Sequence, residues 1–203
     1  MSYEYSEDGL IEEATQQVLE ELGWEVVTAW KKEKFGEDGL LGRDNKSEVI
    51  LTRHLKKALV RLNPDLPPQA YEQAIEQIAQ KIADKSLGKI NKEKAELLKN
   101  GVPVSYTDDK GELVKKKLKV FDFNDYLSNH FLAVRQFEVL GELYLRRPDV
   151  ICFVNGIPLV FMELKAHLHD LQNAFNDNLR DYKDTIPHVF NCNAFIILSN
   201  GTD

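Results

Sequence analysis

Hydrophobic residues in the first half of the chain recur with the spacing of an α-helix. Over residues 7–22 every fourth position on one face is apolar, and Gly23 is suited to end the helix. The same spacing predicts a helix over 47–62, which Asn63-Pro64 ends because a residue that precedes proline avoids the α region. A third helix is expected from Pro67-Pro68 to about Lys85, followed by a charged connector over 89–100 with helical character.

The second half of the chain has the pattern of β-strands, and one further strand, Trp24 to Trp30, is predicted in the first half. After Gly101, apolar runs and turn residues predict a series of strands, at 102–106, 112–123, 130–140, 146–154 and 158–165. A helix over 167–183 and a short strand over 194–198 are expected to close the chain. The order predicts an α/β domain over 1–203, with a mainly helical part (1–100) and a mixed central sheet flanked by helices (101–203). We also expect the chain to be a fragment of a longer protein.

Composition narrows the class of protein. The 203 residues carry a net charge of −7, with 43% hydrophobic and 29% charged residues, which is typical of a globular domain. The strongest apolar run, 150–154, is far too short to cross a membrane, and the polar start does not resemble a signal peptide. Cys152 and Cys192 have no metal-binding spacing and are expected to be reduced thiols of a cytoplasmic protein. The acidic balance argues against DNA binding by bulk charge, so any DNA contact must come from a local patch.

The candidate chemistry lies in two apolar strands and the turn between them. Asp149 precedes the first strand, and Glu163 and Lys165 end the second, two residues apart and therefore on one face. An apolar strand that ends in a carboxylate and an ammonium group is unusual, because burying either one without a partner is costly. An ordinary ion pair at the end of a strand explains this spacing as well, with Asp149 simply following a turn-forming proline.

The turn at Asn155-Gly156 decides between these alternatives. A two-residue turn with regular strands pairs Val154 with Ile157 and sets Asp149 on the face opposite to Glu163. A three-residue turn, or a bulge, sets Asp149 directly across from Glu163. Two neighbouring carboxylates would then repel each other unless a cation lay between them, and Mg²⁺ suits such oxygen ligands. The catalytic interpretation therefore requires a three-residue turn or a bulge, and it leads to metal-assisted hydrolysis of a phosphodiester bond, with Lys165 aiding charge stabilisation.

The segment 146–165, RRPDVICFVNGIPLVFMELK, resembles the nuclease core of the type I restriction enzyme R (restriction and motor) subunit, a member of the PD-(D/E)xK superfamily. Other blocks match in the same order along the chain. They are Glu12, Leu22-Gly23-Trp24, Arg43, Leu62 to Pro67, Asp122-Phe123 and Ile186 to Asn191.

The resemblance implies a restriction-endonuclease-like fold, and an endonuclease region that cleaves double-stranded DNA with Mg²⁺. By position, Asp149, Glu163 and the backbone carbonyl of Leu164 would bind the metal, and Lys165 would be the catalytic lysine. Three further residues would be accessory: Glu12, and on the helix after the triplet Asn178 and Tyr182. The family usually has Gln where this chain has Asn178, which puts the accessory role in doubt. Packing of Tyr182 against the sheet is an equal alternative.

The resemblance also implies partners, namely the modification and specificity subunits of a type I restriction complex. No G-x-x-x-x-G-K-[ST] motif occurs in the chain, so ATP would be bound only by the motor of the full-length subunit. Two alternatives stay open: a docking or DNA-binding module of a restriction complex that lacks catalysis, and another PD-(D/E)xK nuclease of the resolvase or repair type.

Basic residues give two candidate DNA contacts. Arg146, Arg147 and Arg180 flank the proposed site and are the better candidates for phosphate binding. The run Lys115-Lys116-Lys117, with Lys119, lies on a predicted strand. It would contact phosphates without reading sequence, or it would only protect an edge strand from aggregation.

Overall fold

A five-stranded mixed sheet forms the centre of the protein in a computed structural model, which describes residues 7–82, 84–165 and 178–200. The strand order is β1-β4-β7-β8-β9. The outer pairs β1–β4 and β8–β9 are parallel, whereas the inner pairs β4–β7 and β7–β8 are antiparallel. The strands are β1 (Glu25–Thr28), β4 (Phe131–Arg135), β7 (Val150–Val154), β8 (Ile157–Leu164) and β9 (Phe195–Ser199).

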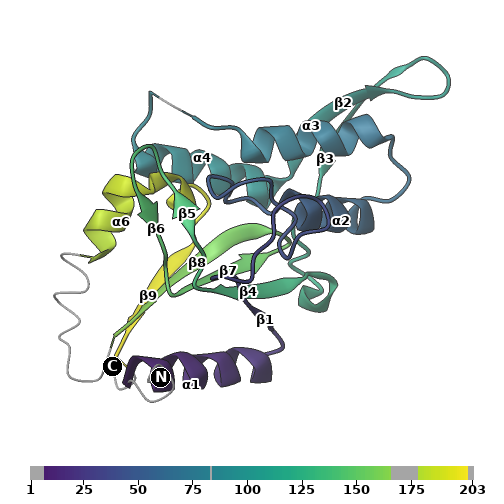
Figure 1. Ribbon diagram of the computed structural model, residues 1–203. Helices are drawn as coiled ribbons and strands as arrows, with labels where there is room; N and C mark the ends of the chain where they lie inside the picture. The colour runs from purple at the N-terminus through teal and green to yellow at the C-terminus, as the bar shows by residue number, and fades with distance from the viewer. Residues whose placement is uncertain (1–6, 83, 166–177, 201–203) are drawn as a thin grey trace.

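Helices cover both faces of this sheet (Figure 1). Helix α1 (Glu7–Glu21) lies along one face, and the other face is covered by α2 (Thr52–Leu62), α3 (Pro68–Ala79), α4 (Leu87–Asn100) and α6 (Arg180–Thr185). Two short 3-10 helices are η1 (Tyr126–Ser128) and η3 (Pro187–Phe190). Two small hairpins lie outside the central sheet: β2 (Val102–Thr107) with β3 (Leu113–Leu118), and β5 (Val139–Leu140) with β6 (Leu145–Arg146). The predicted α/β class, with a mixed central sheet between helices, is confirmed.

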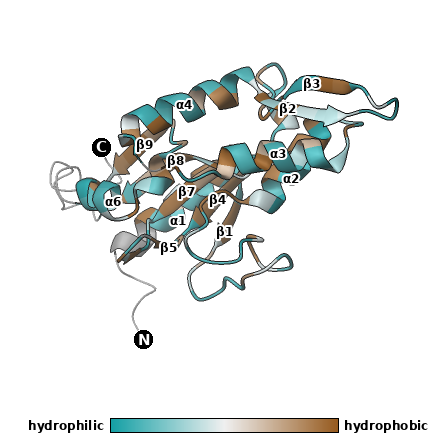
Figure 2. Cartoon of the chain, turned by 90° about the horizontal axis from the view of Figure 1, so that it is seen from above, coloured by the Kyte–Doolittle hydropathy of each residue, from teal (hydrophilic) through white to brown (hydrophobic). Residues whose placement is uncertain are grey.

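The sheet is apolar on both faces because its side chains alternate between two cores. On β7, Ile151 and Phe153 enter the core beneath the larger helical layer, whereas Val150 and Cys152 face α1 and pack near Leu19. Figure 2 shows the central strands largely brown between helices that carry teal surfaces. Each fully buried side chain of this size stabilises the fold by about 1.5–3 kcal/mol. Burial on both faces explains why β7 and β8 read as nearly continuous apolar runs.

Three helical predictions need adjustment at their ends or faces. The helix predicted over 47–62 begins only at Thr52, and the one expected to reach Lys85 ends at Ala79. Over residues 11–22, where burial is described, Leu19 is buried whereas Val18 and Leu22 are exposed, so the predicted apolar face is wrong there by about one position. The charged connector is a full helix, α4, which buries Lys94.

Lys94 explains how a charged segment can be a buried helix. Its Nζ donates to the carbonyl oxygens of Gln77 at 2.7 Å, Ile78 at 2.8 Å and Gln80 at 3.3 Å, which are the last acceptors of α3. A lysine at this place satisfies carbonyl groups that have no partner inside the helix and complements the negative end of its dipole. Burial lowers the pKa of Lys94. The contact ties α4 to α3.

Two predicted strands are shorter than the sequence pattern indicated. The run 130–140 is interrupted because Gln136 has a positive φ of 53°, so β4 ends at Arg135 and the chain resumes as β5. The run 112–123 stops at Leu118, and β3 is an edge strand that pairs only with β2. The predicted helix 167–183 falls mostly outside the described residues, which begin again at Asn178.

Among the described residues, no helix has both the length and the apolar composition that crossing a membrane would require.

Candidate active site

The turn between β7 and β8 has two residues, but β8 contains a bulge that changes its register. Val154 pairs with Ile157 and Phe153 with Pro158, whereas Cys152 pairs with Val160, so Leu159 is the extra residue. Pro158 cannot donate a backbone hydrogen bond to the ladder, which makes an irregularity at this position inexpensive. The carbonyl of Leu159 accepts from the Ala194 N–H at 2.7 Å. Of the two predicted possibilities, a three-residue turn or a bulge, the bulge is confirmed.

The shifted register brings Asp149 to Glu163. Val150 pairs with Met162, so continuing the register by one residue sets Asp149 across from Glu163. Asp149 Oδ2 accepts a hydrogen bond from the backbone N–H of Leu164 at 2.7 Å. Lys165 Nζ lies 2.7 Å from Glu163 Oε1, so all three side chains meet at the end of β8.

Burial makes this cluster electrostatically unusual. Glu163 is 3% exposed, and its Oε2 has no hydrogen-bond partner within the described part of the chain. Burial, followed by repulsion from Glu163, raises the pKa of Asp149 to about 7; the Leu164 N–H and Lys165 oppose this shift, and Glu12 adds to it. Without a bound cation, Asp149 would therefore be partly protonated at neutral pH.

Asn178 and Tyr182, one helical turn apart, face the same cluster. Asn178 Nδ2 donates to Glu163 Oε1 at 3.1 Å, so the shorter amide still reaches the carboxylate. Tyr182 packs its ring edge-on against Phe161, with 5.1 Å between centroids. Burial raises the pKa of Tyr182, and the carboxylates of Glu163 and Asp149 raise it further. The alternative that Tyr182 packs against the sheet agrees with this contact.

Glu12 on α1 is held by residues that the sequence did not single out. Its Oε2 accepts from Arg135 Nη2 at 2.8 Å and its Oε1 from Gln136 Nε2 at 2.7 Å. Gln136 also donates its backbone N–H to the Asp149 carbonyl at 2.8 Å. Gln136 thus connects Glu12 to Asp149, from a backbone conformation that costs free energy in a residue other than glycine. A glutamine after an apolar strand carries no signal that would reveal this from sequence.

The three candidate DNA-binding arginines differ in their availability. Arg146 forms a bidentate ion pair with Asp181, at 2.6 and 2.9 Å, so much of its charge is compensated. Arg147 lies over the ring of Trp30 at 4.2 Å. The Arg180 side chain is 82% exposed, and the carboxylate of Asp184 is 3.9 Å away. Arg147 and Arg180 are therefore freer than Arg146 to contact a phosphate.

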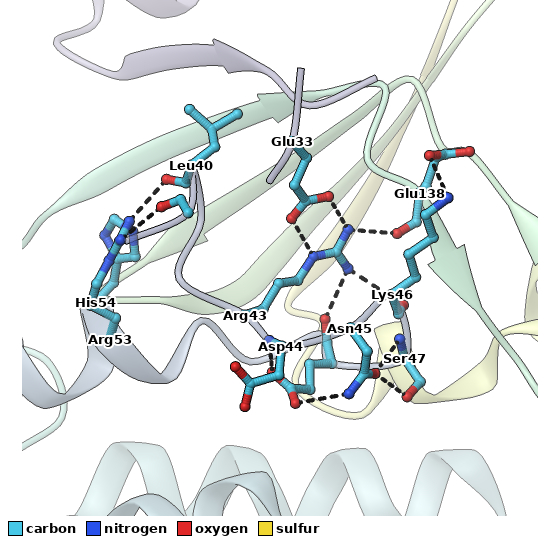
Figure 3. Close-up of polar contacts among 12 residues, drawn as sticks. Glu33, Leu40, Arg43, Asp44, Asn45, Lys46, Ser47, Arg53, His54 and Glu138 are labelled. Atoms are coloured by element: carbon cyan, nitrogen blue, oxygen red, sulfur yellow. Dashed lines mark hydrogen bonds and ion pairs between the residues drawn. The ribbon is translucent and has the colours of Figure 1, made fainter. Parts of the chain in front are cut away.

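A second buried charge, Arg43, lies against the segment that follows β4 (Figure 3). Arg43 is 1% exposed and forms a bidentate ion pair with Glu33, with both distances at 2.6 Å. It also donates to the backbone carbonyls of Glu138, Glu48 and Lys46, so each of its five N–H groups has an acceptor. Its guanidinium lies over Phe137 at 4.1 Å. Arg43 thereby fixes the loop 31–50 to the segment that follows Gln136.

The arrangement offers two carboxylates and backbone oxygen rather than a side-chain metal cluster. Within the described ranges, no three His, Cys, Asp or Glu side chains are grouped so that they could share an ion. Two adjacent carboxylates, one of them with an unpartnered oxygen, and a lysine at their side could attract a hard cation and a phosphate group.

The chain resembles known proteins over nearly all of its length. The family model for the type I restriction enzyme R protein N terminus matches residues 4–203. The chain is 36% identical over 195 residues to the type I restriction enzyme HindI endonuclease subunit of Haemophilus influenzae, covering 94% of this chain and 18% of the relative. It is 30% identical over 208 residues to the putative type I restriction enzyme MjaIXP endonuclease subunit of Methanocaldococcus jannaschii, covering 98% of this chain and 19% of the relative.

These relatives are much longer, and the chain spans less than a fifth of their length. Both relatives are named as endonuclease subunits of type I restriction enzymes, and the family model covers almost every residue of the chain. The chain therefore belongs to the family of type I restriction enzyme R protein N-terminal regions.

Proposed function

We propose that this chain is the nuclease region of a type I restriction enzyme R subunit, which hydrolyses phosphodiester bonds of double-stranded DNA with Mg²⁺. The observation that carries the proposal is the bulge at Leu159. Without it, Glu163 and Lys165 would face away from Asp149, and no pair of carboxylates would exist. The relatives' names, as endonuclease subunits, support the same reaction class.

The donor set fits a hard divalent cation. Glu163 Oε2 is buried without a partner among the described residues, and Asp149 is held near its protonation midpoint at neutral pH by burial and by Glu163. Asp149, Glu163 and the carbonyl of Leu164 would hold Mg²⁺. When bound, the ion would supply Lewis-acid polarisation of the phosphate and a water of lowered pKa.

The chain's own residues would orient the reaction. Lys165, held 2.7 Å from Glu163, would place a positive charge beside the phosphate as negative charge develops. Asn178 would keep Glu163 in position through its 3.1 Å hydrogen bond. Glu12, Gln136 and Arg135 would fix the neighbouring backbone of Asp149. Arg147 and Arg180 would contact the DNA backbone.

The family membership supports a proposal about partners. We propose that the full-length subunit, which binds ATP outside this region, assembles with modification and specificity subunits, and that cleavage requires the assembly. The test therefore uses the assembled enzyme with ATP and a plasmid substrate. Asp149→Asn and Glu163→Gln should each lower cleavage by more than about a thousandfold, because the bound ion contributes several kcal/mol to the transition state. ATP hydrolysis should persist.

Asp181→Asn is the matched control, since it removes an exposed carboxylate that pairs with Arg146 near the same edge. It should cleave within a fewfold of the unaltered enzyme. Cleavage at the normal rate by Asp149→Asn would contradict the proposal. Calorimetric titration of the 203-residue chain with Mn²⁺ tests the alternative of a docking module without catalysis. A docking module would bind no ion, whereas a nuclease region would bind Mn²⁺ and lose this binding in Glu163→Gln.

A further inference from the structure

Positive charge is concentrated in one part of this acidic chain. Residues 81–120 contain eleven lysines and six carboxylates, a net charge of +5, which leaves −12 for the rest. This segment forms α4, β2 and β3, on the side of the central sheet opposite to α1 (Figure 1). Such asymmetry creates a local positive potential that the net charge of −7 conceals.

A small cavity lies within this region. It has a volume of about 170 Å³ between the end of α4, the end of β3 and the loop that follows. We call it the basic pocket, and its charged and aromatic lining consists of Lys99, Lys117, Lys119, Asp122, Phe121 and Phe123. The volume is below the roughly 300–1,000 Å³ of pockets that enclose a drug-sized ligand, so it suits a small group such as a phosphate.

The walls of the basic pocket are fixed by buried amides. Asn63, 6% exposed, donates to the Lys119 carbonyl and accepts from the Lys119 N–H, both at 2.8 Å. Asn155, which is fully buried, donates to the Val120 carbonyl at 2.8 Å. Gly101 brings α4 against β3 so closely that a Cβ would lie 3.1 Å from the Leu118 carbonyl oxygen. The lysines therefore project from a preformed backbone.

The charges around the pocket favour an anion. Lys99 and Lys117 form no ion pair within the described ranges, where the lysines paired with carboxylates are Lys46, Lys85 and Lys165. The carboxylate of Asp122 opposes an anion with one negative charge; it accepts from the N–H groups of Asp125 and Asn124, which lower its pKa, and Lys119 lowers it further. The dipole at the end of α4 adds about half a negative charge, and the three lysines outweigh the two together.

An exposed aromatic side chain completes the site. Phe123 lines the pocket, is 70% exposed and packs edge-on against Phe121, with 6.0 Å between centroids, so much of its ring is free to contact a planar group. Tyr126, 67% exposed, lies on the same loop. Lysines that follow a phosphate backbone next to aromatic rings that stack on bases are how proteins bind single strands without sequence preference.

We propose that the basic pocket binds single-stranded DNA, with one phosphate among Lys99, Lys117 and Lys119 and a neighbouring base stacked on Phe123. Base faces are accessible in a single strand and hidden in a duplex, which is why the aromatic ring selects the single strand. The site uses none of the residues at the end of β8, so it does not depend on the proposed cleavage reaction.

The test measures fluorescence anisotropy of a labelled twelve-residue oligothymidylate with the 203-residue chain in EDTA. Lys117→Ala/Lys119→Ala should weaken binding at least tenfold at low salt, and should lower the slope of log affinity against log salt by about 0.7 for each lysine removed. Phe123→Ala should weaken binding about tenfold with little change in the slope. Circular dichroism and thermal unfolding establish that each variant is folded.

Lys56→Ala/Lys57→Ala on exposed positions of α2 is the matched control and should bind within twofold of the unaltered chain. An equal loss in this control would mean that binding is diffuse and would overturn the proposal. Binding of a duplex that is equally sensitive to Phe123→Ala would overturn the stacking contact. Displacement of the strand by polyglutamate, with no effect of Phe123→Ala, would assign the pocket to acidic protein segments instead. Asp149→Asn should bind the strand normally, which separates this proposal from the nuclease.

Discussion

Two buried charged groups in this protein differ in how completely their polar atoms are hydrogen-bonded. Arg43 and Glu163 are 1% and 3% exposed, respectively. Every N–H of Arg43 has an acceptor, and its charge is balanced by Glu33. Glu163 has an oxygen without a partner in the described structure and a second carboxylate, Asp149, beside it. A buried charge with all its partners supports the fold, whereas one that keeps an unpartnered oxygen and faces a like charge marks a place for a ligand.

The largest effect on the free energy of unfolding is expected at the ion pair of Arg43 and Glu33. Arg43→Met would leave the carboxylate of Glu33, whose side chain is 6% exposed, buried without its partner. Loss of one member of a buried ion pair costs about 3–5 kcal/mol of the free energy of unfolding. Urea unfolding of the 203-residue chain measures this loss in the free energy of unfolding.

The double variant Arg43→Met/Glu33→Met removes both charges and should recover part of that loss. At the other cluster, Glu163→Gln should change the free energy of unfolding by about 1 kcal/mol or less, because it removes repulsion from Asp149 as well as the pair with Lys165. Equal losses in Arg43→Met and Glu163→Gln would abolish the distinction drawn above.

A smaller effect with the opposite sign is expected at Asp149. Its pKa is raised in the folded chain to about 7, so folding favours the protonated form; this contribution is complete below about pH 4 and is lost as pH rises through 7. Asp149→Asn, which stays neutral, should therefore be more stable than the unaltered chain at pH 8 in EDTA, by about 2 kcal/mol once partial exposure is allowed for.

The comparison is made by urea unfolding at pH 4.5 and pH 8. The difference between the two proteins should nearly vanish at pH 4.5, and Mn²⁺ at pH 8 should reduce it, since the ion would stabilise only the chain that retains Asp149. A difference that does not depend on pH would mean that the two carboxylates do not repel each other.

Gln136 should give an effect of about 1 kcal/mol. Its φ of 53° is unfavourable for alanine and acceptable for glycine, and its side chain holds Glu12. Gln136→Ala should lose the hydrogen bond and keep the backbone strain, whereas Gln136→Gly should lose the bond and relieve the strain. Thermal unfolding should therefore rank the glycine variant above the alanine variant. The reverse order would show that the positive φ is not a source of strain.

The smallest effect is expected at Asn178. Removal of its 3.1 Å hydrogen bond to Glu163 by Asn178→Ala should lower cleavage by the assembled enzyme about tenfold or less, the value of one hydrogen bond of about 0.5–1.5 kcal/mol. Asn178→Gln, which restores the amide usual in the family, should remain within threefold of the unaltered enzyme. A larger loss in Asn178→Gln than in Asn178→Ala would mean that the shorter side chain fits a local packing requirement.

The site was predictable from sequence to the extent that it depends on strand alternation. Glu163 and Lys165 share a face because side chains alternate along a strand, and that inference needed no structure. The position of Asp149 needed the register, which the turn alone could not give. Pro158 is the residue that points to the bulge, because a proline inside a central strand must avoid the ladder.

Contacts between distant segments were beyond sequence reasoning. Arg43 meets Glu33 and the carbonyl of Glu138, and Gln136 meets Glu12, across separations of 95 and 124 residues in the longest cases. The face of α1 was misjudged for the same reason. Its burial is set by the sheet on which it packs, so Leu19 is buried and Val18 is exposed. Local pattern gives the elements, whereas tertiary packing selects which of their residues meet.

The extra residue in β8 has a consequence for how this segment can vary. Deletion of Leu159 would remove the bulge but keep Glu163 across from Asp149, because Val160 already pairs with Cys152. Deletion of Phe161, beyond the bulge, would shift everything that follows by one step and move Glu163 and Lys165 into the apolar space now filled by Met162 and Leu164. Segment 160–165 should accordingly tolerate many exchanges of side chains and almost no change in length, because one register sets both the carboxylate pair and the core.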